Sequence, residues 1–496
     1  ERDNNNVVYS PAAGGFSVKL PQQPAVTYEK AGKDGNSTWT YEAVNKTTGS
    51  AYLIIKKSVY NFDFLDQDSF ELKLVEESFR SPDYFERQLH RKLSSFNGYP
   101  RLEVEEKMKD SAVVTAHYLI KGPHYYALAI RTDKKEEAAA FFSSFQLTPY
   151  RYPASSQFTD TFMHFTANTP VAPAIDTGYR AVIEKVAKAA RGSYYNEYSN
   201  DTENKSAYFF SDSTGEAIMV SIEKLSDYYY GKDTAAFWKS QTEGFEGSNE
   251  MVVSNKKYFE KPGGVKGYTL NVTDTGSSKK IIAAVLLKNN YLFNIITMGD
   301  TLDHQSSFTS NFFTSFTADE TAKGRDIFTN PLDTFFAHLF STDSGTLAKA
   351  QKSIGEVYYG EAGVPKIMDA LKKLSPGYKN YFEVKTKLIA ELGFIKDTTN
   401  PVVVDHLKSI YTQTADTSMF QNEAITALAR HKTKYATSSF KEMVLQDPPV
   451  YDEDSYSYSS PFNSLEDTLE LAAQLYPDIL QLTSLDDYKE PVMDLL

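Results

Sequence analysis

The sequence contains one pattern twice, and this constrains its fold more than any other feature. The phrase Phe16–Pro21, followed by Pro24, returns as Phe165–Pro170, followed by Pro173. Five further landmarks keep their order, and the offsets run from 149 to 171 residues. They are Ala51–Lys57 with Ala217–Glu223, Phe79 with Phe245, Gly98-Tyr99 with Gly267-Tyr268, Leu119–Lys121 with Leu286–Lys288, and Phe141–Phe145 with Phe312–Phe316. So many matches in the same order and at nearly constant offsets are not expected by chance. We therefore predict a tandem duplication of one module.

Each copy shows the patterns of a sheet covered by helices. Val113–Ile120 and Tyr125–Ile130 flank a short polar turn, and Ile281–Leu287 and Tyr291–Ile296 do the same in the second copy, which predicts a β-hairpin in each. The segment Lys134–Phe145 carries apolar residues at helical spacing. We therefore expect a module made of a sheet with helices on one face.

After Asp326 the alternation typical of strands gives way to helical periodicity. Helix pairs are expected at Val384–Phe394 with Pro401–Tyr411 and at Asn422–Arg430 with Ser438–Leu445, with Gly355–Leu374 and Leu465–Leu475 flanking them. Ile389 and Leu392 recur as Ile425 and Leu428, and Val404 and Leu407 recur as Phe440 and Met443. The predicted fold class is α+β: two tandem antiparallel-sheet sandwich modules over residues 1–152 and 153–322, then an all-helical solenoid over residues 323–496.

The order of these elements resembles the PsbP-like α/β/α sandwich over Gly15–Tyr150 and Phe162–Asp319. That resemblance implies a largely non-catalytic binding or assembly module, and no polar motif allows binding residues to be carried over. The second copy departs from the pattern by an added basic amphipathic stretch, Tyr179–Arg191, which predicts an extra helix. The helical array resembles HEAT repeats in its pairing.

Composition excludes several classes of function. The net charge of −13 repels phosphate backbones and anionic lipid heads, so nucleic acid is not expected as a partner. The absence of cysteine rules out disulfides, thiolate metal sites and cysteine nucleophiles. No run of about 18 apolar residues occurs, so no transmembrane helix is expected. A cleaved signal or a lipid-bearing cysteine upstream of Glu1 stays open, and Pro491–Leu496 ends inside an expected helix, which suggests a piece of a longer protein.

A search for catalytic and metal-binding patterns assigns no catalytic residue, cofactor or metal. No Gly-x-Ser-x-Gly elbow occurs, and Pro262–Gly267, the nearest approach to a phosphate-binding loop, precedes a strand and is interpreted as a turn. His117 and His124 flank a hairpin turn and could share a metal ion, but their aromatic and aliphatic neighbours favour packing. The acidic groups Glu136-Glu137 and Asp452–Asp454 are interpreted as solvated surface rather than calcium ligands.

Tyrosine and phenylalanine rows at matching places in the two copies are the candidate binding surface. Tyrosine is favoured in interface hot spots, so such rows could bind a glycan or a protein. The alternative is that they cover a sheet edge. The residues are Tyr60, Phe62, Tyr194, Tyr195, Tyr228, Tyr229 and Tyr230.

The tripeptides at Asp110, Asp233, Asp300 and Asp467 resemble the O-glycosylation signal of Bacteroidota envelope proteins, which implies a periplasmic or outer-membrane location. The leading hypothesis is a non-enzymatic envelope scaffold or binding protein with protein partners, forming part of a larger assembly and without a transmembrane segment. One alternative is the accessory region of an envelope enzyme of the TraB/GumN hydrolase type, whose catalytic domain lies outside this chain. Another is a glycan- or lipid-binding module. A polar cluster with shifted pKa values in a deep cleft would overturn the hypothesis of an interaction scaffold.

Overall fold

The computed structural model describes residues 7–31, 36–176, 203–245, 250–302, 304–396, 401–450 and 461–495. Contacts divide the chain into two compact units. Unit 1 comprises Glu1–Tyr195, Thr202–Leu225 and Asp233–Asp326, and unit 2 comprises Asn196–Asp201, Ser226–Lys232 and Ile327–Leu496. The predicted α+β fold class, two tandem antiparallel sheets followed by helices, is confirmed. The finer division into residues 1–152, 153–322 and 323–496 stays a prediction.

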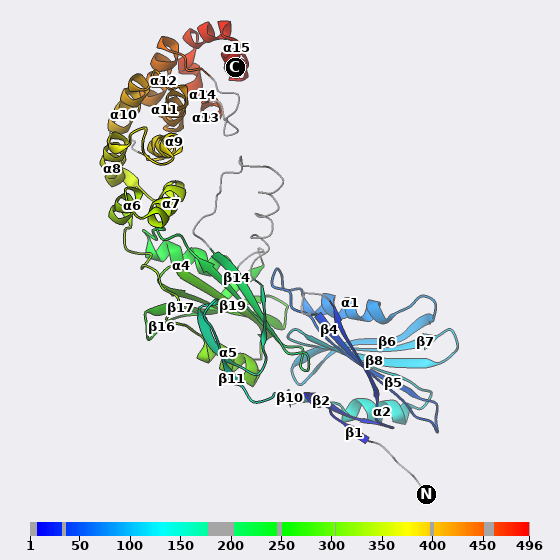
Figure 1. Cartoon of the computed structure of the whole chain (residues 1–496). Helices are drawn as coiled ribbons and strands as arrows, with labels where there is room; N and C mark the ends of the chain where they lie inside the picture. Colours follow the sequence, from blue (N-terminus) through cyan, green and yellow to red (C-terminus); the bar gives the residue numbers. More distant parts are fainter. Residues whose placement is uncertain are drawn as a thin grey trace. The chain divides into compact units, whose positions relative to one another are not determined.

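Unit 1 holds the same set of strands and helices twice (Figure 1). Module 1 has β1 (Val7–Tyr9), β2 (Gly14–Leu20), β3 (Ala25–Ala31), β4 (Asn36–Val44), β5 (Ala51–Ser58), α1 (Asp68–Phe79), β6 (Phe85–Phe96), β7 (Tyr99–Met108), β8 (Val113–Lys121), β9 (His124–Arg131), α2 (Lys135–Ser144) and β10 (Gln146–Tyr150). Module 2 has β11 (Ser156–Asp160), β12 (Phe165–Thr169), β13 (Pro173–Asp176), β14 (Glu203–Phe210), β15 (Ala217–Lys224), α4 (Thr234–Glu243), β16 (Met251–Lys261), β17 (Val265–Asp274), β18 (Lys279–Lys288), β19 (Tyr291–Asp300), α5 (Ser307–Ser315) and β20 (Thr317–Ala318).

The sheet topology proves the repeat. The large sheet of module 1 has the order β3-β4-β5-β9-β8-β7-β6, and that of module 2 has the order β13-β14-β15-β19-β18-β17-β16. Each module also has a three-stranded sheet, β1-β2-β10 or β11-β12-β20. The predicted Tyr179–Arg191 helix lies outside the described residues.

Two details of the repeat differ from the sequence-based prediction. Module 1 does not have its helices on one face: α1 and α2 lie on opposite faces of the large sheet (Figure 1). The match of Gly98-Tyr99 with Gly267-Tyr268 is also wrong, because Tyr99 and Val265 begin β7 and β17 directly after glycines at positive φ, Gly98 and Gly264. A Gly-Tyr pair, Gly267-Tyr268, occurs further along β17, and the sequence comparison matched this pair instead of the turn.

The inner core of each module closes on a pair of stacked phenylalanine rings. Phe16 and Phe145 lie 5.8 Å apart between ring centroids in module 1, and Phe165 and Phe316 lie 4.7 Å apart in module 2. Both pairs are buried and join β2 or β12 to the residue that ends α2 or α5. The two phrases that marked the start and end of the repeat in sequence are therefore direct packing partners.

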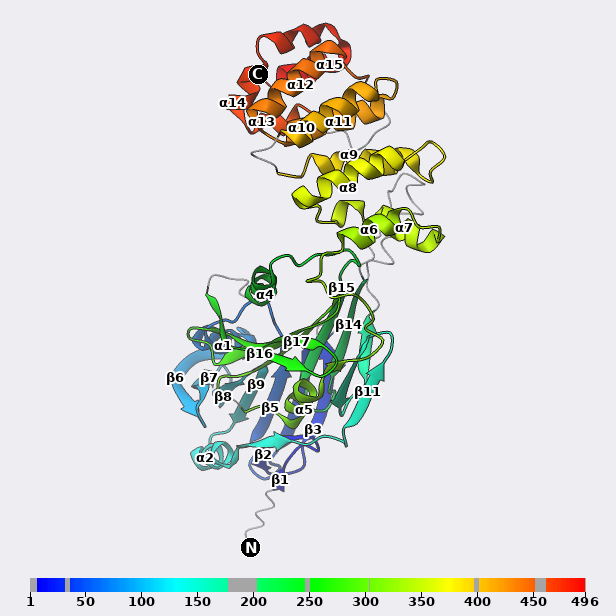
Figure 2. The ribbon, with the colours of Figure 1, turned by 90° about the vertical axis from the view of Figure 1, so that its left-hand side faces the viewer.

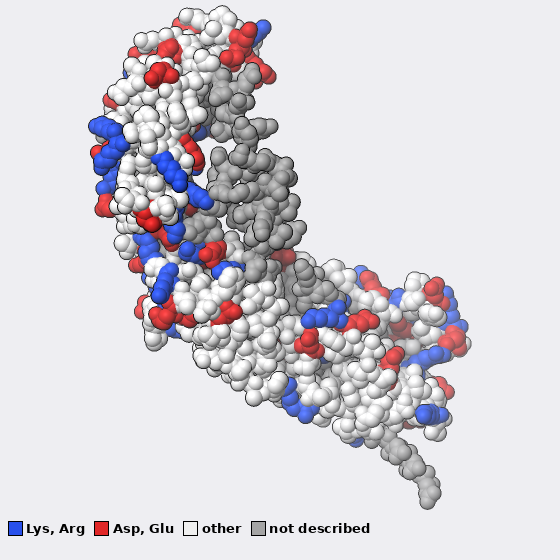
Figure 3. Space-filling model, in the orientation of Figure 1, with Lys and Arg blue, Asp and Glu red and all other residues white. Residues whose placement is uncertain are grey.

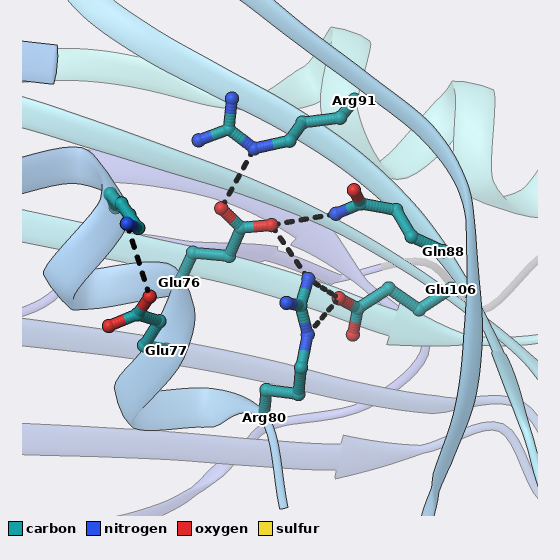
Figure 4. A network of polar contacts seen from close by, with 7 residues as sticks. Glu76, Glu77, Arg80, Gln88, Arg91 and Glu106 are labelled. Atoms are coloured by element: carbon teal, nitrogen blue, oxygen red, sulfur yellow. Dashed lines mark hydrogen bonds and ion pairs between the residues drawn. The ribbon is translucent and has the colours of Figure 1, made fainter.

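A buried carboxylate fastens α1 to the outer strands of module 1 (Figure 4). Glu76 is 3% exposed and accepts hydrogen bonds from Arg80 at 2.8 Å, Gln88 at 2.7 Å and Arg91 at 2.9 Å. Arg80 also donates to Glu106 of β7. A buried charge needs such partners, because an unpaired one costs several kcal/mol, so the network holds the β6–β7 hairpin under α1. Charged side chains of both signs gather at this end of module 1 (Figure 3).

Unit 2 is a helical array whose helices follow one another in chain order (Figure 2). Its elements are α6 (Leu332–Leu339), α7 (Ser344–Lys352), α8 (Gly360–Lys373), α9 (Tyr381–Leu392), α10 (Val402–Gln413), α11 (Ser418–Arg430), α12 (Lys434–Gln446), α13 (Asn463–Glu466), α14 (Leu469–Ala472) and α15 (Asp486–Asp494), with 3₁₀ turns at Ile354–Glu356, Ala473–Leu475 and Asp478–Ser484. The recurring pairs Ile389 with Ile425 and Leu392 with Leu428 are fully buried, which confirms a repeat in this region. Gly393 allows α9 and α11 to approach closely, since a Cβ there would lie 2.7 Å from the Ala427 Cα. No helix within the described ranges is long and apolar enough to cross a bilayer.

Candidate functional site

The two modules of unit 1 meet where the inner core of module 1 ends in a buried lysine. Alternate residues of a strand share a face, so β5 places Lys56 in line with the core residues Tyr52 and Ile54. Lys56 is 3% exposed, and its Nζ donates a hydrogen bond of 2.5 Å to the carbonyl oxygen of Thr214 in module 2. Burial lowers the pKa of Lys56 to about 7, against the opposing effect of the nearby Glu216 carboxylate. The amine is thus held at a pKa where it is only partly charged at neutral pH.

Aromatic rings complete the pocket of this lysine. Lys56 Nζ lies 5.0 Å from the centre of the Trp39 ring and 4.4 Å from that of Tyr150. The faces of such rings attract a cation, which offsets part of the cost of burying it. The buried lysine therefore has one carbonyl and two ring faces as partners.

The turn that presents Thr214 fits against module 1 because it carries a glycine. Gly215 has φ +77°, and a Cβ there would lie 2.2 Å from Ser58 Oγ and 2.7 Å from Trp39 Cη2. The matching turn of module 1 has Gly49 at φ +75°, where a Cβ would meet nothing within 4 Å. Both turns need glycine for their backbone conformation. Only Gly215 also needs it for the approach of the two modules.

Beside the turn, Ser58 and His124 form a buried pair. Ser58 Oγ lies 2.7 Å from His124 Nδ1, and the two residues are 0% and 5% exposed. Burial, with Lys56 and Lys121 nearby, holds the pKa of His124 well below its usual value, so the ring is neutral. A serine beside a neutral histidine has the composition of a nucleophile and its base. The Gly215 turn covers this serine, however, so its hydroxyl serves packing and hydrogen bonding in this arrangement.

Glu216, the residue after the turn glycine, is the buried acid of the junction. It is 7% exposed, and its Oε2 accepts a hydrogen bond of 3.1 Å from the Thr214 hydroxyl. Burial raises the pKa of Glu216 to about 7, opposed by a hydrogen bond from Ser306 and by Lys56 and Lys121. The carboxyl can therefore exchange a proton near neutral pH.

A cavity of about 640 Å³ opens next to these groups, between the modules. This volume lies inside the range of roughly 300–1,000 Å³ typical of small-molecule sites. Both modules contribute to its wall. The lining residues are Tyr60, Asn97, Tyr99, Lys121, Pro123, His124, Leu147, Thr148, Pro149 and Tyr150 from module 1, and Glu216, Ile282, Met298, Gly299, Asp300, His304, Gln305, Ser306, Ser307 and Thr309 from module 2.

One side of the cavity is built around Asp300, at the end of β19. Its Oδ2 accepts a hydrogen bond of 3.1 Å from the Tyr99 hydroxyl, and its Oδ1 accepts one of 2.9 Å from the backbone N–H of Leu302. The Tyr99 hydroxyl also lies 2.9 Å from His304 Nδ1. Burial and the Asp300 carboxylate raise the pKa of Tyr99 above its usual value, so it stays protonated. This corner is a closed hydrogen-bond network joining the two modules.

Lys121 is the least satisfied group on the cavity wall. It ends β8, is half-buried, and its Nζ lies 5.6 Å from the centre of the Tyr150 ring and 6.0 Å from that of Tyr99. Across the described ranges, its ammonium has no hydrogen bond and no ion pair. Burial lowers its pKa, with Asp300 and Glu216 opposing. The equivalent Lys288 of module 2 instead donates to the Asp319 carbonyl at 2.8 Å.

The start of α5 also lines the cavity. Ser306 caps this helix, accepting a hydrogen bond of 3.2 Å from the Thr309 N–H, and Ser307 begins its first turn. A hydroxyl of the wall, Thr148 Oγ1, is buried without a hydrogen-bond partner. Buried polar atoms are usually paired, so Thr148 marks a place where a ligand atom would be accepted.

The structure does not bring the predicted binding residues that it describes together on one surface. Tyr60 lines the cavity, and Phe62 packs against the module 2 core beside Leu65, so both lie at the module junction. Tyr228, in unit 2, is 1% exposed, and its hydroxyl lies 2.9 Å from His338 Nδ1.

The remaining predicted residues and the two histidines lie in different surroundings from one another. Tyr229 is half-buried, and Tyr230 lies 6.2 Å from Tyr358 between ring centroids. Tyr194 and Tyr195 lie outside the described residues. His117 stacks on Phe142 at 3.7 Å between ring centroids, whereas His124 pairs with Ser58. In the described part of the chain, no group of three or more His, Cys, Asp or Glu residues could hold a metal ion.

Sequence reasoning missed most of the junction. Lys56, Lys121 and Glu216 occupy strand ends and a turn, where charged residues are ordinarily solvated, and nothing local marks them as buried. One signal was present: Lys56 alternates with Tyr52 and Ile54 on the apolar face of β5, and it stands where the repeat has Ile222. A charged residue aligned with an aliphatic core residue in a duplicated module is a sign of a special environment.

No protein-family model and no curated protein sequence matches this chain. Among solved structures, PsbP of the cyanobacterium Synechocystis is similar with 12% sequence identity and a TM-score of 0.23, over 33% of this chain and 92% of that one. The type VI secretion immunity protein TplEi of Pseudomonas aeruginosa is similar with 8% identity and a TM-score of 0.17, over 65% of this chain and 99% of that one. The chain thus shows a weak similarity to the fold of PsbP, and no family is assigned to it.

Proposed function

We propose that this chain is a non-enzymatic binding protein of the bacterial cell envelope, and that unit 1 holds a small ligand between module 1 and module 2. The cavity of about 640 Å³ at the module junction carries this proposal. A scaffold that only positions other proteins has no need for buried groups such as Lys56 and Glu216, whose pKa values burial moves to about 7. Glu216 lines the cavity, and Lys56 lies beside the same turn. Groups with perturbed pKa values in or next to a cavity are typical of binding and active sites, so a binding protein is favoured over a pure scaffold.

The chemistry of the junction supports binding rather than turnover. The Ser58–His124 pair next to the cavity is covered by the Gly215 turn, and Asp300 already accepts hydrogen bonds from Tyr99 and the backbone. The remaining polar groups can hold a ligand by hydrogen bonds. We extend the proposal to a PsbP-like origin of the two modules and to a periplasmic or outer-membrane location in Bacteroidota, which rest on the sequence resemblances alone.

Unit 2 is proposed as the part that binds a protein partner. Its helices resemble HEAT repeats in their pairing, and arrays of this kind present extended surfaces to peptides and proteins. Isolation of the chain from envelope membranes, followed by mass spectrometry, identifies such a partner. Loss of the co-purifying protein when residues 327–496 are deleted from the chain supports the assignment, and its retention contradicts it.

The binding function is tested by thermal shift and calorimetry on the whole chain against a library of sugars, amino acids, organic acids and phosphate. Ser307 is exposed and lies at the rim of the cavity, so Ser307→Trp is expected to block it. The matched control is Ser310→Trp, which adds the same side chain to an exposed position of α5 outside the lining. We expect one compound class to stabilise the parent and the control but not Ser307→Trp. If no class binds the parent, the proposed function is wrong.

A further inference from the structure

The charges on the cavity wall do not favour an ionic ligand. The wall carries one lysine, Lys121, and two carboxyl groups, Glu216 and Asp300, one of which is fully engaged by Tyr99 and backbone N–H groups. An anion would approach Lys121 but meet both carboxyl groups, and a cation would meet Lys121 with Lys56 behind it. A ligand without net charge avoids both penalties.

The wall is nevertheless rich in groups that need a hydrogen-bond partner. Lys121 has three N–H donors and no hydrogen bond within the described ranges, and Thr148 Oγ1 is buried without a partner. The two oxygens of Glu216 can accept further hydrogen bonds beside those from Thr214 and Ser306. An apolar ligand would leave all of these unpaired. Hydroxyl groups suit them best, because each hydroxyl both donates and accepts and so can serve a lysine, a threonine and a carboxylate in turn.

Aromatic rings supply the apolar part of the wall. Tyr60, Tyr99 and Tyr150 line the cavity, with Leu147 and Pro149 beside them. A tyrosine presents a flat apolar face and a polar edge, which matches a ring whose faces carry C–H groups and whose rim carries hydroxyls. Resting on the ligand cavity of the proposed function, we propose that the junction binds an uncharged, hydroxyl-rich ring compound, a mono- or disaccharide, with Lys121, Thr148 and Glu216 as its hydrogen-bond partners.

Isothermal calorimetry on the whole chain tests the class of ligand with defined probes. The uncharged set is glucose, galactose, mannose, N-acetylglucosamine, maltose and cellobiose, and the charged set is phosphate, citrate, glutamate, galacturonate and lysine. We expect binding from the uncharged set, with an affinity that changes less than about twofold between roughly 0.05 and 0.5 M sodium chloride, since no net charge is exchanged. An anion would lose affinity with salt.

Three substitutions connect binding to the cavity. Lys121→Met, Thr148→Val and Glu216→Gln each remove one hydrogen-bonding group, and Lys121→Met is expected to weaken the sugar by about tenfold or more. Lys57→Met is the matched control: it removes the same charge from an exposed position of β5 that does not line the cavity, and affinity should not change. Unchanged melting temperatures show that each variant is folded, and Thr148→Val serves if Lys121→Met does not fold.

The outcomes separate this inference from the proposed function. Binding from the charged set alone, blocked by Ser307→Trp, overturns the sugar assignment and leaves the ligand cavity standing. Sugar binding that survives Lys121→Met, Thr148→Val and Glu216→Gln overturns the assignment of these residues. If no probe binds the parent chain, both proposals are wrong.

Discussion

The two modules of unit 1 share their strand order but differ sharply where β5 meets β9 and β15 meets β19. In the strand register, Ser58 of β5 lies opposite His124 of β9, and Lys224 of β15 lies opposite Tyr291 of β19. These two positions are therefore equivalent in the two modules. Module 1 therefore has Lys56, Ser58 and His124 where module 2 has Ile222, Lys224 and Tyr291. Since Ile222 fills its place as an ordinary core residue, the fold does not require a lysine there. The polar cluster is a property of the junction, and the predictions below test how the two modules differ there.

The largest effect is expected where the modules are alike. Phe145→Asp and Phe316→Asp each replace a buried ring, stacked on Phe16 or Phe165, with a charge. Each should destabilise its module by about 4 kcal/mol or more, because a buried charge without a partner is among the costliest substitutions. Urea denaturation measures this. Phe70→Asp on α1, at a ring that is 50% exposed, is the control, and equal midpoints for all three variants and the parent would contradict the packing described.

The next largest loss of stability is expected at Gly215, and it should exceed the loss at the equivalent Gly49. Gly215→Ala and Gly49→Ala impose the same strain on a backbone at positive φ, about 1–2 kcal/mol. Gly215→Ala also forces a methyl group against Ser58 and Trp39, for a total loss of about 3 kcal/mol or more. The free energy of unfolding of the two variants checks this. Equal losses would mean that the turn of module 2 does not fit against module 1 as described.

Two substitutions at equivalent positions of the modules test the buried lysine. Ile222→Lys places an amine in the apolar core of module 2 and should cost about 3 kcal/mol. Lys56→Met should leave the chain folded but change its pH dependence. The pKa of Lys56 is lowered from 10.5 to about 7, so the unfolded chain binds the proton more readily, and stability rises as pH increases from 7 to 10.5. Urea midpoints across this interval should flatten in Lys56→Met, and an unchanged slope would refute the assignment.

The smallest effect concerns Glu216, whose equivalent in module 1 is Ser50. The pKa of Glu216 is raised from 4.5 to about 7, so the folded chain holds a proton that the unfolded chain releases. Its contribution to stability is present below pH 4.5 and is lost as pH rises through 7. Glu216→Gln should remove this decline, and Glu42→Gln, at an exposed position of β4, should retain it. Urea midpoints at pH 5 and pH 7 measure the difference.

The repeat could be predicted because it depends on apolar residues at regular spacing. Phe16, Phe145 and their equivalents are large rings in short phrases, and burial of such rings dictates both the sequence pattern and the packing. The helix pairs of unit 2 followed from the same kind of pattern, with Ile389 and Ile425 as markers. Periodicity of this kind reports on contacts inside one element or between neighbouring elements.

The cavity could not be predicted because its parts come from segments far apart in the chain. Lys121 and Glu216 face it only after two modules have folded and met, and no local pattern records that meeting. Tyr60 was predicted as part of a candidate binding surface, and it lines this cavity. Its position in a polar stretch after β5 gave no sign that the second module would cover it.

The shared wall of the cavity has a consequence for any study of one module by itself. Module 1 supplies Tyr99 and Lys121 to this wall, and module 2 supplies Glu216 and Asp300. A module expressed by itself would therefore lack every lining group that the other module supplies. Binding experiments on a separated module would not test the cavity described above.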